Sequence, residues 1–288
     1  MTAKPLVAAT DGSEESLRAV EWAAREAVLR GAPLRILSAV SVPRMFNLLV
    51  RPDRDFIADL IREERDQALA AAAAQVSEVA PGLQVDTAPL AGPPAQAVTG
   101  SGSGALMLVL GSRGTGAFAS MALGSVARYA ADHASCPVVI VRGETAAVHQ
   151  RVGIGIGDLD TRADPLTFAF EEASLRKASL MAIHAWHTPH TAIPRAGSPA
   201  PDLAAIEAEA ARQLAGLLDN WRKRYPDVPV SQYVVHDRPS RALVGLSARA
   251  DLVVIGRHAS QPGLQGPGSV RHAVLNHALG PVTVVPSS

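Results

Sequence analysis

The sequence predicts an α/β protein made of two doubly wound domains in tandem, each built on a five-stranded parallel sheet. Three observations support this prediction: a pattern repeated in the two halves, nearly continuous apolar strands that alternate with helices, and glycine and polar residues directly after some of those strands. At 288 residues the chain is long enough for two small α/β domains. Apolar residues make up 48% of it, so both halves can bury a core.

The two halves repeat one pattern at a spacing of 144 to 146 residues. A Gly-Ser-Val triplet followed by a histidine and a Pro-Val pair begins at Gly124 and again at Gly268, 144 residues later. An apolar run that ends in glycine recurs upstream at an offset of 145. Self-similarity of this kind indicates a duplicated domain. We therefore expect one domain over residues 1–143 and a second over residues 151–288.

Within the first half, short apolar runs predict strands and the segments between them predict helices. Ser13 is a suitable N-cap for the first helix, the two glutamates after it suit the positive end of the helix dipole, and Gly31 ends it. Strands are expected at residues 5–10, 34–40, 83–89, 105–110 and 137–141. The later helices are expected at residues 53–79, 94–100 and 121–134.

Polar and glycine residues follow the first and fourth expected strands. Asp11-Gly12 comes after the first strand, and Gly111-Ser-Arg-Gly114 comes after the fourth. Ligands of doubly wound sheets bind beyond the carboxyl ends of the strands, where the winding direction reverses. The sequence therefore predicts a ligand site at this edge of the sheet.

The glycine spacing favours a phosphate as the ligand. The pattern Gly111-x2-Gly114-x9-Gly124-Ser125 lets backbone amides approach an anion closely and places Ser125 near a helix N-terminus. Arg113 could pair with the anion or be a solvated loop residue. Glycine turns after strands are also ordinary loop chemistry, so spacing alone leaves both readings open.

The same spacing resembles the ATP-binding signature of the universal stress protein family. Residues 7–13, 92–95 and 126–138 are also similar to that family, and the resemblance covers the chain once per half. It implies the strand order 3-2-1-4-5 and ATP, with Mg²⁺, held between the ends of strands one and four. It also implies that the fifth strands mediate dimerisation, so the two halves are expected to pack as a pseudo-twofold pair.

Roles carried over from the resemblance fall on seven positions of the first half. Asp11 would lie beside the ribose or the metal-bound phosphates, or it could be only a turn or helix-cap residue. Backbone groups of Val40 would meet the adenine, or Val40 could be only a core residue. The ribose and phosphate path would be formed by the glycines and the start of the following helix: Gly111, Gly114, Gly124, Ser125 and Val126.

The second half departs from this pattern. Ala259 replaces the second glycine, the spacer after it is one residue shorter, and Asp158 matches Asp11 only if one residue is inserted. The three other motif residues persist as Gly256, Gly268 and Ser269. We therefore expect a second nucleotide site that is weak, altered or empty.

Other motifs are interpreted as structural. The spacing His184-x2-His187-x2-His190 runs from a strand into a loop and gives no regular ligand geometry, so no metal site is predicted there. The run Gly153-x-Gly155-x-Gly157 lacks dinucleotide spacing and is interpreted as a closely packed strand.

The sequence favours a regulatory nucleotide-binding protein over two other classes. A slow ATPase or phosphotransferase is one alternative, although neither a Walker A loop nor a kinase catalytic loop is present. A nucleotide-free interaction scaffold is the other. The balanced charge, 27 basic and 27 acidic residues, gives no indication of nucleic-acid binding. A single cysteine and the absence of a signal-peptide pattern or a membrane-length apolar run predict a cytoplasmic protein without membrane attachment. A homodimer and a regulatory protein partner fit this class.

Overall fold

The structure is a computed structural model, and it describes residues 3–38, 54–114, 123–143, 148–157, 163–187, 202–257 and 269–286, with the backbone alone for 54, 55, 57 and 163. The chain divides into two compact units, Met1–Thr145 and Ala146–Ser288. Each unit alternates strand and helix throughout, as the sequence predicts.

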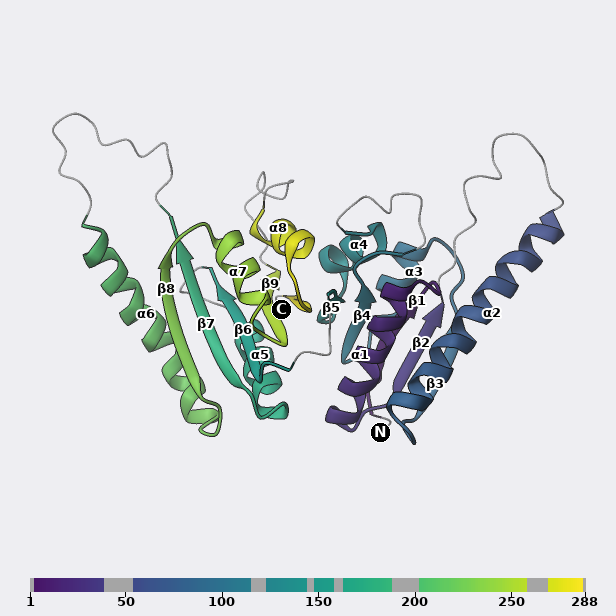
Figure 1. Cartoon of the computed structure of the whole chain (residues 1–288), viewed down its shortest axis with the longest axis horizontal. Helices are drawn as coiled ribbons and strands as arrows, with labels where there is room; N and C mark the ends of the chain where they lie inside the picture. Colours follow the sequence, from purple (N-terminus) through teal and green to yellow (C-terminus); the bar gives the residue numbers. More distant parts are fainter. Residues whose placement is uncertain are drawn as a thin grey trace, which may run out of the picture. The chain divides into compact units, whose positions relative to one another are not determined.

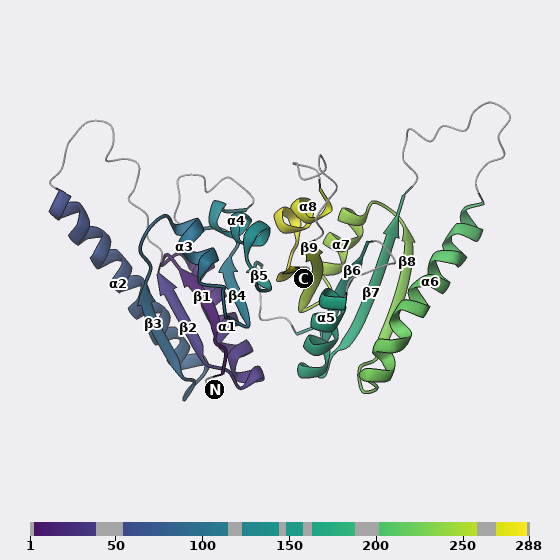
Figure 2. The ribbon, with the colours of Figure 1, turned by 180° about the vertical axis from the view of Figure 1, so that it is seen from behind.

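The first unit is a parallel five-stranded sheet with the order β3-β2-β1-β4-β5. This is the expected 3-2-1-4-5 order. Helices α1 and α2 lie on one face of the sheet, and α3 and α4 lie on the other (Figures 1 and 2). Its elements in chain order are β1 (Leu6–Thr10), α1 (Glu14–Arg30), β2 (Leu34–Ser38), α2 (Arg54–Val79), β3 (Val85–Pro89), α3 (Pro94–Gly100), β4 (Met107–Gly111), α4 (Ser125–His133) and β5 (Val138–Val141).

Burial explains why the central strands are nearly continuous apolar runs. Every residue of the central strand β1 is buried, and so are four of the five residues of its neighbour β4, because helices cover both faces of the sheet at its centre. The edge strand β3 is mostly exposed, and its sequence is correspondingly mixed. The core of the unit therefore lies under the strands whose carboxyl ends carry the predicted site.

The helix termini follow local capping chemistry. The side chain of Ser13 accepts a hydrogen bond from the Ser16 amide at the start of α1, which confirms the expected N-cap. Helix α4 begins at Ser125, later than the expected residue 121. Gly124 is its N-cap, with extended backbone angles of −68° and 154°, so the helix cannot start before it. The predicted helix start near Gly124-Ser125 is thus the N-terminus of α4 itself.

The second unit repeats the same connectivity, with parallel strands in the order β8-β7-β6-β9-β10. Its elements are β6 (Arg151–Ile156), α5 (Ala163–Leu175), β7 (Ser179–Trp186), α6 (Leu203–Arg224), β8 (Val230–His236), α7 (Pro239–Ser247), β9 (Leu252–Arg257), α8 (Val270–His277) and β10 (Val282–Pro286).

The glycines of β6 allow helix α7 to pack very closely. A Cβ on Gly153 would lie 2.5 Å from Leu246 Cδ2, and a Cβ on Gly155 would lie 2.8 Å from Leu243 Cδ1. The interpretation of this glycine run as close packing is confirmed, and the close neighbour is a helix.

Candidate functional site

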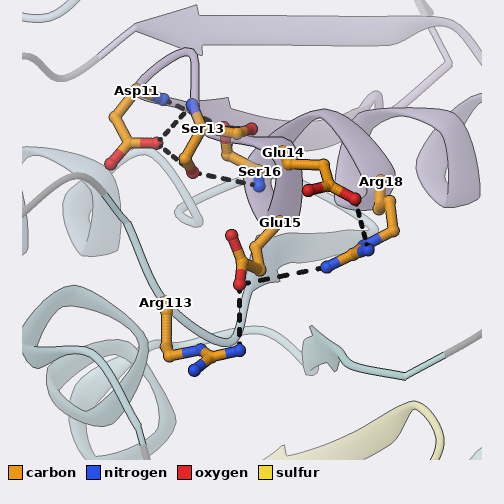
Figure 3. A network of polar contacts seen from close by, with 7 residues as sticks. All are labelled: Asp11, Ser13, Glu14, Glu15, Ser16, Arg18 and Arg113. Carbon is orange, nitrogen blue, oxygen red and sulfur yellow. Dashed lines mark hydrogen bonds and ion pairs between the residues drawn. The ribbon is translucent and has the colours of Figure 1, made fainter. Parts of the chain in front are cut away.

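The turn after β1 fixes the carboxylate of Asp11. Its Oδ1 accepts hydrogen bonds from the Ser13 amide at 3.1 Å and the Ser13 hydroxyl at 2.6 Å (Figure 3). The Asp11 amide donates to the Ser16 hydroxyl at 3.3 Å. Asp11 therefore has the turn role that the sequence left open, and these bonds also restrict how its carboxylate can rotate.

The end of β4 lies directly against this turn. A Cβ built on Gly114 would lie 2.1 Å from Asp11 Oδ2, far inside van der Waals contact. Two residues that are 103 positions apart in the sequence thus meet at the carboxyl edge of the sheet. A side chain at position 114 would require the Asp11 carboxylate to shift, so the structure brings Asp11 and the glycine loop into direct contact.

Gly111, the last residue of β4, makes a second close approach. A Cβ there would lie 2.7 Å from the Glu15 carbonyl oxygen and 3.0 Å from the Ser16 amide nitrogen. Both neighbours are backbone atoms of the first turn of α1. Gly111 therefore sets the distance between strand β4 and helix α1.

Several amides at the start of α4 have no acceptor among the described residues. The Gly124 amide donates to the Ser112 carbonyl at 2.8 Å, which brings the two ends of the glycine loop together. Arg128 is the first residue of the helix whose amide bonds back, to Gly124 O at 3.0 Å. Among the described residues no acceptor is found for the amides of Ser125, Val126 and Ala127, and the Ser125 side chain is exposed. Free first-turn amides and the helix dipole favour an anion at this position.

Arg113 forms an ion pair with the first turn of α1. Its Nη2 lies 3.0 Å from Glu15 Oε1, and the two side chains are 46% and 25% exposed (Figure 3). Arg113 is therefore held by an ion pair and is not simply a solvated loop residue. An exposed pair of this kind is worth about 1 kcal/mol or less, so a bound anion could compete for it.

Arg142 is a basic residue of this edge that sequence reasoning missed. It directly follows β5, and the preceding Val141 carbonyl accepts a hydrogen bond from Ser112 N at 3.1 Å. Its guanidinium is half-buried, and this burial together with the positive charge of Arg113 lowers the pKa of Arg142 from its usual value. The signal that could have found it is its position immediately after a strand at the same carboxyl edge as the glycine loop.

The second unit keeps less of this arrangement. Gly256 lies within β9, but the Ser269 hydroxyl accepts a hydrogen bond from the His272 amide at 3.2 Å and so caps its own helix. Strand β10 ends at Pro286, and this proline occupies the position that Arg142 has in the first unit. The predicted residues Val40, Asp158 and Gly268 lie outside the described residues.

The first unit fits a phosphate-bearing ligand by these observations. Three amides without an acceptor among the described residues, an exposed hydroxyl and the Arg113 guanidinium belong to a loop and helix start whose Gly114 stands against the Asp11 carboxylate. A carboxylate in this position suits a metal-bound phosphate better than a bare anion, because like charges repel. Fold and site together define a doubly wound α/β protein with a glycine-rich loop at its topological switch point.

Comparison with known proteins agrees with this class. The family model described as the universal stress protein family matches residues 2–142 and again residues 149–286. Two universal stress proteins of Mycobacterium tuberculosis are similar at 35% and 32% identity; the alignments cover 98% of this chain in both cases, and 97% and 96% of the relatives. The crystal structure of a universal stress protein from Archaeoglobus fulgidus shares the fold, with a TM-score of 0.70 at 19% identity over 100% of both chains. The chain therefore belongs to the universal stress protein family, with two copies of the family domain.

No described helix is both long and apolar enough to cross a membrane. Among the same residues no group of three or more histidine, cysteine or acidic side chains has the arrangement of a metal site. Of the three spaced histidines, His184 has its Nδ1 3.0 Å from the Ile156 carbonyl oxygen. His190 lies outside the described part of the chain.

Proposed function

We propose that the first unit binds ATP with Mg²⁺ as a regulatory ligand in a stress response, and that the protein acts in the cytoplasm. The observation that carries this proposal is the close approach of Gly114 to Asp11 beside the free amides of α4. In this proposal the phosphates are held by the backbone of Gly124, Ser125 and Val126 and by the Ser125 hydroxyl. Gly111 and Gly114 line the path to them, and Asp11 faces the metal-bound phosphates.

The proposal extends to the organisation of the whole chain. Residues 1–143 form the nucleotide-binding domain, and residues 151–288 form a domain whose ATP motif is degenerate. Adenine contacts come from Val40, and Asp158, Gly256, Gly268 and Ser269 form the altered counterpart of the first site. A regulatory protein partner reads the bound state, and a homodimer is a suitable assembly for that readout.

A calorimetric titration of MgATP into the full chain tests this function. We expect binding of about one equivalent per chain, because the second unit uses Ser269 as a cap and lacks a counterpart of Arg142. ADP, AMP and cyclic AMP serve as comparison ligands, and weaker binding of AMP is expected because it lacks the distal phosphates. Two equivalents would contradict the degenerate second site, and no binding of any of the four nucleotides would remove the proposal.

Replacing Glu15 with glutamine is expected to strengthen MgATP binding by about 2- to 5-fold, since an exposed ion pair is worth up to about 1 kcal/mol. Glu15→Gln removes the carboxylate 3.0 Å from Arg113 and leaves the guanidinium available to a phosphate oxygen. Glu14→Gln is the matched control, because Glu14 lies in the same helix turn, is 81% exposed and pairs with Arg18. Calorimetry measures both variants. A weaker affinity for Glu15→Gln would mean that Glu15 instead positions Arg113 for binding.

A further inference from the structure

The edge strand β8 of the second sheet differs from its counterpart β3 in the first. It has seven residues, Val-Ser-Gln-Tyr-Val-Val-His, and none of them is acidic, lysine or arginine. Strand β3 has five residues and contains Asp86 and Pro89. Short length, charged residues and proline are features by which sheet edges avoid pairing with other chains. Strand β8 therefore lacks the protection that β3 has.

The backbone of β8 directs a row of polar groups to the free edge. The Leu180 amide donates to the Pro229 carbonyl at 2.8 Å where β7 meets β8. Residues of a parallel strand direct their backbone groups alternately to the two sides, so the odd-numbered residues of 231–235 face β7. The even-numbered residues of 230–234 then face outward, and no backbone partner for them is found in the described part of the chain.

Proline interrupts the corresponding row in the first unit. By the same alternation Pro89 occupies an outward position of β3, because the Leu34 amide donates to the Gln84 carbonyl at 2.9 Å. Proline has no amide hydrogen, so one outward donor is missing there. Sheet register gives Val234 as its counterpart in the second unit, and this valine keeps its donor.

The side chains beside the edge have also changed from charged to uncharged. In the first unit Arg35 on β2 pairs with Asp86 on β3 at 2.9 Å, and both side chains are more than half exposed. Sheet register places Met181 and Ser231 at the same positions of the second unit. An exposed ion pair in one repeat thus corresponds to an uncharged pair in the other.

Tyr233 is the most exposed large apolar side chain of this edge. It is 45% exposed, and its register partner Ile183 on β7 is half-buried, as is Val235 two residues further along β8. Successive side chains of a strand point to opposite faces, and Gln232 turns toward α6, where its Oε1 accepts a hydrogen bond from Arg222 Nη2 at 3.0 Å. Tyr233 and Val235 therefore lie on the face of the sheet away from α6.

A second copy of the same strand satisfies this edge by symmetry. Tyr233 is the fourth of the seven residues, so a twofold axis there pairs all of β8 with the antiparallel β8 of a second chain. The outward groups of Gln232 then meet those of Val234 of the second copy, and Tyr233 faces its own copy at a non-hydrogen-bonded position, where side chains are closest. No like charges are brought opposite each other, because β8 contains none of the charged residue types named above.

We propose that the protein forms a homodimer in which β8 of one chain pairs with the antiparallel β8 of a second copy about Tyr233. This inference rests on the homodimer of the proposed function and supplies its interface. The apolar side chains Ile183, Tyr233 and Val235 of each chain then form one patch that is continuous across the paired strands.

Sedimentation velocity of the full chain over a range of concentrations, without nucleotide, tests this interface. We expect a reversible dimer, and Tyr233→Lys to weaken it about 10- to 30-fold, because the variant removes the central aromatic pair and sets two like charges opposite each other. Thr87→Lys is the matched control, since it places the same charge at an exposed position of the edge strand β3, and it should dimerise as the wild type does. Circular dichroism and thermal melting of each variant show whether it remains folded.

Disulfide cross-linking reports the register of the paired strands. The single cysteine of the chain, Cys136, is buried, so an introduced thiol gives a clear signal. Tyr233→Cys faces its own copy across the twofold axis and should form a covalent dimer when it is oxidised with copper phenanthroline in air. Val235→Cys is the control on the same face, because it lies opposite Ser231 of the second copy. It should stay unlinked alone and form a covalent dimer when it is mixed with Ser231→Cys.

The outcomes separate this interface from the rest of the proposed function. A dimer that Tyr233→Lys leaves unchanged, or that Tyr233→Cys fails to cross-link, would overturn the β8 interface while the homodimer itself stands. A wild-type chain that stays monomeric at every concentration would overturn both, and the open edge would then fit an extended segment of another protein. MgATP binding is measured on the same samples, and Tyr233→Lys is expected to leave it unchanged. If the wild type dimerises through β8 but binds no MgATP, only the nucleotide part of the proposed function fails.

Discussion

Replacing Gly114 with alanine is expected to weaken MgATP binding by about 10- to 100-fold, since overpacking of this kind costs about 1–3 kcal/mol and each 1.4 kcal/mol is tenfold in affinity. The added methyl group would lie 2.1 Å from Asp11 Oδ2. The carboxylate cannot easily turn away, because two hydrogen bonds from Ser13 hold its other oxygen. Either the carboxylate gives up these hydrogen bonds or the glycine loop moves away from the turn after β1, and both changes alter the proposed site.

Two further glycine variants separate local obstruction from general damage. Gly100→Ala in α3 is the matched control, because nothing lies within 4 Å of the added Cβ, and it should bind as the wild type does. At Gly124 the nearest atoms are 3.5 Å from an added Cβ, so the free protein tolerates alanine there. A loss of affinity in Gly124→Ala would then report contact with the ligand. Wild-type affinity in Gly114→Ala, measured by calorimetry, would contradict the close-approach argument.

Replacing Gly111 with alanine is expected to destabilise the first unit by about 2–3 kcal/mol, in the range seen for overpacked buried sites. The obstructing atoms are the Glu15 carbonyl at 2.7 Å and the Ser16 amide nitrogen at 3.0 Å, and both belong to the helix backbone. Backbone of a capped helix turn cannot rotate away as a side chain end can. Scanning calorimetry should show the melting transition lowered by roughly 5–12 °C, since 1 kcal/mol shifts a domain of this size by about 2–4 °C or slightly more.

An exposed helix glycine provides a control of opposite sign. Gly216 lies in α6 with nothing within 4 Å of an added Cβ, so Gly216→Ala should raise stability by about 0.5–1 kcal/mol. If both variants lower the melting temperature equally, the close approach of β4 to α1 is not the cause of the Gly111 effect.

The fold was predictable because its signals are local. Strands buried on both faces of a parallel sheet are mostly apolar, and β1 and β5 are buried at every residue and apolar at all of them except Thr10. The N-cap Ser13 and the terminal Gly31 set the bounds of α1 through short-range backbone chemistry. Helix α4 begins four residues after the expected residue 121, because Gly124 takes an extended conformation and is its N-cap.

The site was predictable only in part, because its geometry depends on long-range packing. Spacing identified Gly111, Gly114 and Gly124, but it could not reveal that Gly114 abuts Asp11 or that Arg113 pairs with Glu15. Predicting those contacts requires the distances between strand β1, strand β4 and helix α1, which only the folded structure provides. Arg142 escaped notice because a single basic residue after a strand resembles any solvated chain end. The roles of these residues in nucleotide binding remain predictions for the titrations described above.

The tight packing of β6 on α7 has a consequence for how the duplicated halves have diverged. Gly153 and Gly155 leave room for Leu246 and Leu243, whereas the equivalent positions of β1 are Val7 and Ala9. The volume has moved from the strand in one repeat to the helix in the other. Recombination between the two repeats that transferred β1 into the second unit without its helix would create a steric clash, and the reverse transfer would leave a void. Strand β6 and helix α7 have therefore become a matched pair, and neither can be replaced by its counterpart from the first unit without the other.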